Sequence, residues 1–243
     1  MDLLTSFTLA FFGGVFPTFI WLYFWLQEDK KHPEPKFTIL RCFAYGMFSV
    51  PIAAIMQFIW NQFFINHADI EFLFHKHYLI AMITLIVWSA IEELLKYVSA
   101  NKGGISQKDN NEPIDPIVYM ITAALGFAAL ENTFYLFNLI AQGESLSNII
   151  ITGNIRFIGA TLLHVSSSAV IGMFIAFAYY KHIAVQARYL LTGVVLSIVL
   201  HTIFNSFIIR SDKFTLLGFS FVWLVALYVI LMFEKIKKTI KNK

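Results

Sequence analysis

The sequence predicts an all-α protein, a polytopic transmembrane helical bundle of about seven spans. Apolar runs of roughly 20 residues, the length that crosses a bilayer, recur along the whole chain. Hydrophobic residues make up 58% of the 243 residues and charged residues only 14%, against about 25% in a soluble domain. In lipid each backbone polar group must pair internally, which favours helices over open strands. This composition excludes a soluble enzyme, a disordered chain and a typical nucleic-acid-binding protein, and the single Cys42 excludes a disulfide scaffold.

The apolar runs divide the chain into spans whose ends are defined to within a few residues. The first run lacks a basic leader and a small-residue cleavage site, so we expect it to stay in place as a span. The second run is long enough to tilt, and Pro51 within it favours a kink. We expect residues 1–243 to form one integral membrane domain. In chain order, the predicted spans are Leu3–Leu26, Phe37–Ile65, Tyr78–Ser99, Ile117–Ala141, Phe157–Tyr180, Tyr189–Ile209 and Phe214–Phe233.

Basic residues predict the orientation in the cell membrane. Thirteen Lys and Arg residues fall in one alternate set of flanking segments and four in the other. Because basic loops stay in the cytoplasm, we expect the N-terminus outside and the C-terminus in the cytoplasm. An odd number of spans agrees with this assignment.

Few ionisable residues lie well inside the predicted spans. An ionised side chain at the bilayer centre costs about 2.5–3.5 kcal/mol on insertion scales, so such residues usually face one another or a wet cavity. The sequence therefore predicts one shared intramembrane site. Its candidate members are Glu92, Glu93, Lys96, Glu131, His164 and His201.

Glu92, Glu93 and Lys96 belong to the third predicted span. The two carboxylates follow one another and point about 100° apart, and Lys96 is close enough in the helix to pair with either. Two carboxylates in a low-dielectric site resist double ionisation, so one could hold a proton while the other acts as a base. The simpler interpretation is a local ion pair at a cytoplasmic helix end.

Polar residues of the later spans extend this set. Glu131, with Asn132 beside it, follows a stretch of small residues that allows close helix approach, and could equally serve only as an interhelical hydrogen-bonding group. Asn205 lies four residues after His201 and therefore on the same helix face. Arg156 is expected near the external end of its helix, where snorkelling to the interface is as good an interpretation as a functional charge.

These residue types can activate water. A glutamate can take a proton from water while histidine or asparagine donors stabilise the developing oxyanion. Alternatively His164, His201 and a glutamate, for which we take Glu93, could hold one divalent metal ion such as zinc. The His-Glu-x-x-His helix of zincins and the Gly-x-Ser-x-Gly elbow of serine hydrolases do not occur in the sequence.

Several segments, in their order along the chain, resemble the PrsW family of membrane proteases. Glu34 and Pro35 resemble the Glu-Pro element after the first span, and Glu92–Lys96 has the family's paired-glutamate form. A departure is Pro116, which follows Asp115 where an Asp-Gly step is familiar. The remaining matching positions are Gly126, Glu131, Asn132, Tyr135, Arg156, His164, His201 and Asn205.

The resemblance implies a membrane-embedded endopeptidase, in a family often classed as metallopeptidases. It implies that Glu92 and Glu93 activate water and that His164 and His201 act as donors or metal ligands. Asn205 would then orient His201 or the oxyanion. The implied partner is a membrane protein substrate in the lipid bilayer, such as a membrane-tethered anti-sigma factor.

Two other function classes fit the same polar cluster. An ion- or proton-coupled transporter also places charges at mid-depth, although the sequence shows no inverted repeat. A membrane scaffold without catalysis is the second alternative. Supporting roles near the site are expected for Lys96, Asn132 and Arg156.

Overall fold

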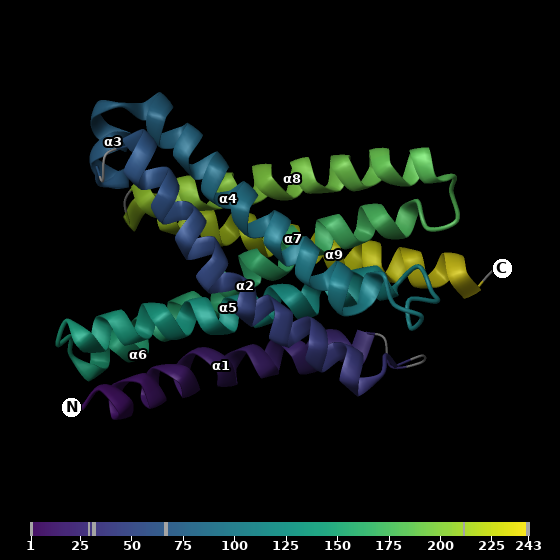
Figure 1. Ribbon diagram of the computed structural model, residues 1–243, viewed down its shortest axis with the longest axis horizontal. Helices are drawn as coiled ribbons and strands as arrows, with labels where there is room; N and C mark the ends of the chain where they lie inside the picture. The colour runs from purple at the N-terminus through teal and green to yellow at the C-terminus, as the bar shows by residue number, and fades with distance from the viewer. Residues whose placement is uncertain (1, 29, 31–32, 66–67, 211, 242–243) are drawn as a thin grey trace.

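The fold is a bundle of membrane-spanning helices (Figure 1). The computed structural model describes residues 2–28, 30, 33–65, 68–210 and 212–241, and regular structure within these ranges is entirely helical. Seven helical stretches in this part of the chain are long and apolar enough to cross a membrane, which confirms the predicted fold class. The helices are α1 (Leu3–Glu28), α2 (Lys36–Trp60), α3 (Ile70–Lys76), α4 (Tyr78–Ala100), α5 (Asp115–Ala141), α6 (Leu146–Ile158), α7 (Ala160–Phe177), α8 (Ile183–Arg210) and α9 (Asp212–Lys241). Short π-helical turns, η1 (Asn61–Ile65) and η2 (Asn101–Ile105), continue α2 and α4.

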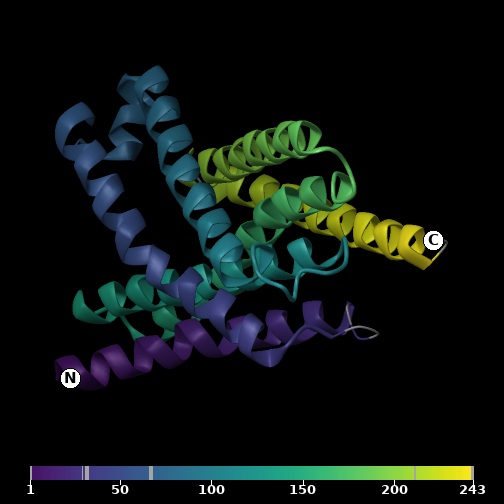
Figure 2. The same cartoon turned by 45° about the vertical axis from the view of Figure 1, so that its right-hand side comes forward.

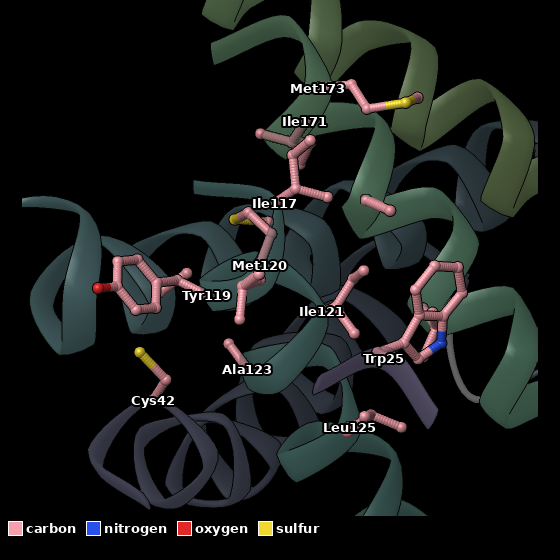
Figure 3. Packing of buried hydrophobic residues seen from close by; sticks show 14 of the residues in the cluster. Trp25, Cys42, Ile117, Tyr119, Met120, Ile121, Ala123, Leu125, Ile171 and Met173 are labelled. Atoms are coloured by element: carbon pink, nitrogen blue, oxygen red, sulfur yellow. The ribbon is translucent and has the colours of Figure 1, made fainter. Parts of the chain in front are cut away.

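Helix α5 is the centre of the bundle. It packs extensively against α1, α2 and α7, and residues along most of its length are buried (Figures 1 and 2). A helix that is apolar on all sides, as α5 is, needs neighbours on all sides. Side chains from α1, α2 and α7 meet those of α5 in the largest core cluster, which includes Trp25, Cys42, Ile117, Ile121 and Met173 (Figure 3).

Small residues bring α2 and α5 into backbone contact. A Cβ atom added at Gly46 of α2 would lie 2.0 Å from the carbonyl oxygen of Ala123, and one added at Gly126 of α5 would lie 2.0 Å from the carbonyl oxygen of Phe43. Lipid tails are as apolar as protein side chains, so helices in a membrane associate through close packing of this kind rather than through a hydrophobic effect. The small-residue stretch that precedes Glu131 is therefore the surface that holds α2.

The fifth span differs from its predicted limits. It begins at Leu146 rather than Phe157, because Ser145 caps the helix by accepting a hydrogen bond from the backbone N–H of Asn148 at 3.3 Å. The span is interrupted at Gly159, which separates α6 from α7. A Cβ atom at Gly159 would lie 2.3 Å from Cε1 of Phe219, so the interruption also allows α9 to pack closely.

We predict that Gly126→Ala destabilises the protein because the added methyl group collides with the α2 backbone. Overpacking of this kind typically costs about 1–3 kcal/mol. The matched control is Gly153→Ala in α6, where the nearest atom to the new Cβ is Leu136 Cδ2, at the ordinary contact distance of 3.7 Å. Thermal unfolding in detergent should show a lower melting temperature for Gly126→Ala only, and equal melting temperatures for the two variants would contradict the packing argument.

Candidate active site

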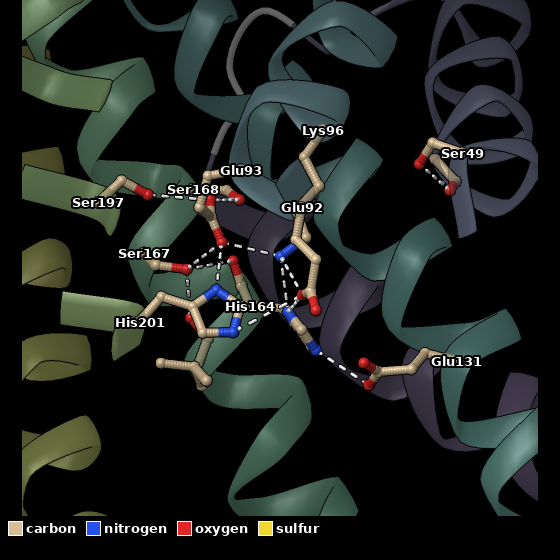
Figure 4. A network of polar contacts seen from close by, with 12 residues as sticks. Ser49, Glu92, Glu93, Lys96, Glu131, His164, Ser167, Ser168, Ser197 and His201 are labelled. Carbon is tan, nitrogen blue, oxygen red and sulfur yellow. Dashed lines mark hydrogen bonds and ion pairs between the residues drawn. The ribbon is translucent and has the colours of Figure 1, made fainter. Parts of the chain in front are cut away.

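Six ionisable side chains from four helices lie together inside the bundle (Figure 4). Helix α4 contributes Glu92, Glu93 and Lys96, helix α5 contributes Glu131, and helices α7 and α8 contribute His164 and His201. Except for Glu131, each of these residues is buried. The structure thus places together the residues that the sequence analysis selected from four separate spans.

Glu93 is the most highly bonded member of the cluster. Its Oε1 atom accepts from Lys96 Nζ at 2.8 Å and from Ser167 Oγ at 3.0 Å, and lies 2.8 Å from His201 Nδ1. Its Oε2 atom accepts from Ser168 Oγ at 2.8 Å and Ser197 Oγ at 2.9 Å. The Glu93 carboxylate therefore links α4, α7 and α8.

Lys96 is a fully buried cation within this network. Its Nζ atom lies 2.7 Å from His164 Nδ1, 3.6 Å from Glu92 Oε2 and 4.6 Å from the centre of the Phe127 ring. An ammonium group can only donate, so Nδ1 of His164 accepts and Nε2 of His164 carries the proton. That proton faces Glu131 Oε2 at 3.1 Å.

Glu92 has one oxygen atom with a hydrogen bond and one with only a longer ion-pair contact to Lys96. Oε1 accepts from Gln57 Nε2 at 3.0 Å, whereas Oε2 is buried without a hydrogen-bond partner. Oε2 lies 3.6 Å from His201 Nε2 and 3.9 Å from His164 Nδ1. Because Nδ1 of His201 must donate to the Glu93 carboxylate, Nε2 is an acceptor when the ring is neutral. In that form two acceptor atoms face each other, and the Lys96 ammonium group, 3.6 Å from Glu92 Oε2, is beyond the length of a good hydrogen bond.

This pair of acceptors suits a cation or a water molecule. Among the described residues, Glu92, His164 and His201 form a group whose ligand atoms lie within 4.8 Å of one another. Glu93, the acidic ligand expected from the sequence, has five polar contacts of its own and instead holds the far nitrogen of His201. A carboxylate in that position orients a metal-binding histidine. Both His164 nitrogens already have contacts, so binding by His164 requires one of these to give way.

Arg156 lies in the last turn of α6, near a helix end as expected, but within the longer span that α6 and α7 form together. It is ten residues past the start of α6 at Leu146, and its side chain is 17% exposed. Its Nη2 atom contacts Glu131 Oε2 at 2.5 Å and its Nε donates to Asn132 Oδ1 at 2.6 Å. Asn132 Nδ2 in turn donates to Thr161 Oγ1 at 3.0 Å. Arg156 therefore fixes Glu131, which contacts His164.

One predicted residue lies outside the hydrogen-bonded cluster, and several residues without a predicted role lie within it. Asn205 makes no hydrogen bond to the cluster within the described part of the chain, and its role stays a prediction. The sequence analysis assigned no role in the site to Gln57 or to the serines that bind Glu93. A signal for the serines does exist, because Ser197 lies one helical turn before His201, and Ser167 and Ser168 lie about one turn after His164.

Comparisons with known proteins agree with this site. The model of the PrsW family of intramembrane metalloproteases matches residues 34–233, which include each of the clustered side chains. The chain belongs to the PrsW family. As a family member it is a multi-pass membrane protease, and the transporter and scaffold alternatives are not needed.

Curated relatives of the PrsW family match nearly the whole chain. The chain is 22% identical over 225 residues to Protease PrsW of Clostridioides difficile (strain 630), covering 92% of this chain and 87% of the relative. It is 27% identical over 205 residues to Protease PrsW of Geobacillus kaustophilus, covering 83% and 80%. It is 28% identical over 223 residues to Protease PrsW of Oceanobacillus iheyensis, covering 89% and 92%. No solved structure matches the chain significantly.

We predict that Lys96→Met strongly destabilises this PrsW family protein. Removing one partner of a buried ion pair leaves the other charge uncompensated, which costs about 3–5 kcal/mol. Lys102→Met is the control, because Lys102 is exposed. Denaturant unfolding in detergent should separate the two variants, and a Lys96→Met protein as stable as the control would show that Lys96 does not neutralise Glu93.

Proposed function

We propose that this PrsW family protease cleaves a membrane-tethered protein at a reaction centre formed by Glu92, His164 and His201. The observation that carries the proposal is the buried Glu92 Oε2 atom, which has no hydrogen bond and lies 3.6 Å from both His201 Nε2 and the Lys96 ammonium group. A buried carboxylate oxygen without a hydrogen bond is costly even beside an ion-pair partner, so the position suits a group that arrives from outside the chain. A water molecule to be activated, or a metal ion that binds it, is such a group.

Glu93 acts in this proposal as a positioning residue. Its bonds to Ser168, Ser197 and Lys96 fix the carboxylate, and the carboxylate fixes the ring of His201 through Nδ1. The resulting tautomer directs the free electron pair of Nε2 towards Glu92. Neighbouring glutamates in the sequence thus receive different roles, with Glu92 at the reacting water and Glu93 behind the histidine.

His164 connects the reaction centre with Glu131, which is partly exposed at the surface of the bundle. Its Nε2 atom donates to Glu131, and the Glu131 side chain is 31% exposed. Arg156 holds Glu131 at this edge. Since His164 connects Glu131 with Lys96, it is placed to donate a hydrogen bond to the developing oxyanion or to pass a proton to the leaving amine.

A divalent metal ion such as zinc fits the three side chains Glu92, His164 and His201. When bound, it would supply Lewis acidity towards the scissile carbonyl and lower the pKa of water. The net charge of the network is compatible with a bound cation, because three glutamates face only two permanent cations, Lys96 and Arg156. Direct activation of water by Glu92 uses the same oxygen atom without a metal.

The proposals for the substrate and the orientation rest on sequence patterns. The bilayer context favours a substrate helix that enters sideways and unwinds locally, and the family resemblance implies regulators such as anti-sigma factors. The distribution of basic residues supports an external N-terminus and a cytoplasmic C-terminus.

We predict that Glu92→Gln abolishes cleavage in cells without preventing membrane insertion, and that Glu93→Gln, which leaves Lys96 without its nearest carboxylate, loses cleavage together with stability. Loss of a general base or of its oriented partner typically lowers the rate by about 10²–10⁴. The matched control is Glu144→Gln, because Glu144 is exposed and outside the cluster. Quantitative membrane proteomics should show the same uncut protein in both variant strains and not in the control strain. Normal cleavage by Glu92→Gln would contradict the assigned reaction centre.

We also predict that purified protein binds about one divalent metal ion per chain and that His201→Ala loses it. A ligand that binds only the folded state stabilises it, so the metal should also raise the melting temperature of the unmodified protein. His182→Ala is the control, because His182 is exposed. Elemental analysis measures the stoichiometry. Active protein free of metal would instead support direct activation of water by Glu92.

A further inference from the structure

An apolar groove lies between α1 and α2, away from the candidate active site. These two helices diverge from their connected ends and each packs against α5 (Figures 1 and 2). The groove between them has a volume of about 750 Å³. It therefore results from two helices that share a support and make little contact with each other.

The groove has a buried floor and exposed walls. Val15, Ile39 and Phe43 are nearly inaccessible at its base, whereas Phe16 and Leu40 are 61% and 63% exposed along its sides. A concave surface of this kind surrounds an apolar chain on more than one side, unlike the convex face of a single helix. Its lining thus suits a hydrocarbon chain.

One end of the groove is cationic. Lys30 and Lys36, with Gln27, line it near the start of α2, and both lysine side chains are exposed. Glu34 also lines this end, and its carboxylate accepts a hydrogen bond from the hydroxyl group of Tyr119, which directs it towards α5. Within the described lining, two lysines thus face one glutamate, and this end of the groove carries a net positive charge.

The length of the groove matches the depth of one bilayer leaflet. From Lys36 to Met47 the α2 wall extends about 16 Å at 1.5 Å per residue, close to the roughly 15 Å hydrocarbon depth of one leaflet. Gln57, the α2 contact of Glu92, lies about 15 Å further along the helix.

We propose that the α1–α2 groove is a binding site for one anionic phospholipid. An acyl chain occupies the floor formed by Val15, Ile39 and Phe43, and the phosphate group pairs with Lys30 and Lys36. Juxtamembrane lysines attract anionic headgroups in this way. The bound lipid completes the contact between α1 and α2 that the side chains leave open.

The test is a lipid titration of the full-length protein in detergent, followed by native mass spectrometry with dioleoyl phosphatidylglycerol and dioleoyl phosphatidylcholine as probes. We expect one tightly bound phosphatidylglycerol molecule per chain and weaker binding of phosphatidylcholine. The Lys30→Gln/Lys36→Gln variant should lower phosphatidylglycerol affinity roughly 30-fold, since two surface lysines are removed. The matched control is Lys102→Gln/Lys108→Gln, which removes two exposed lysines outside the groove and should leave the affinity unchanged.

A second variant tests the apolar part of the site. Ala44 lines the groove, and Ala44→Phe should reduce the binding of both lipids by filling it. Equal affinities of the unmodified protein for the two lipids would overturn the proposal. So would an equal loss of phosphatidylglycerol affinity in the two double-lysine variants, or displacement of the lipid by a transmembrane peptide. The lysine variants alone decide the outcome if Ala44→Phe does not fold.

Discussion

The structure depends on how a membrane interior accommodates buried charge. Glu93 and Lys96 are both completely inaccessible, and each is stable there only because the other lies 2.8 Å away. Desolvation of two ions is costly, and the remaining lone pairs and protons need partners of their own. The serines of α7 and α8 and the ring of His201 supply these partners. The position of α4 against α7 and α8 therefore follows from one carboxylate and its hydrogen bonds.

Close packing at α5 makes this arrangement possible. The backbones of α2 and α5 meet at Gly46 and Gly126, which brings Gln57 of α2 towards Glu92. The same helix presents Glu131 to His164 and supports both α1 and α2. One helix with small side chains thus organises the polar cluster on one side and leaves the apolar groove on another.

The sequence predicted most of the fold because the hydropathy and the length of each apolar run directly reflect the thickness of the bilayer. It also selected the clustered side chains, since few ionisable residues occur within the spans. It could not separate the roles of Glu92 and Glu93. Successive helical positions differ by about 100°, and Lys96 is within reach of both, so only the positions of α7 and α8 show which carboxylate faces the serines. The family resemblance shares this limit, because it matches both glutamates at once.

Arg156 illustrates a second limit of sequence interpretation. The polar residues Ser145 and Asn148 suggest a loop, although they form the capped first turn of a helix. An apolar scan therefore starts the span too late and places Arg156 at its edge. Interhelical contacts of polar residues in membranes depend on such register, which hydropathy does not encode.

The interruption at Gly159 gives Arg156 and His164 separate supports. No residue of α6 is fully buried, so lipid surrounds much of this helix, whereas α7 is held in the core. A change in bilayer thickness would act first on α6, because exposed segments adjust to hydrophobic mismatch by tilting. Such a tilt would loosen the Arg156–Glu131 contact while the imidazole of His164 stayed in place. The edge of the polar cluster would then respond to bilayer thickness before its centre does.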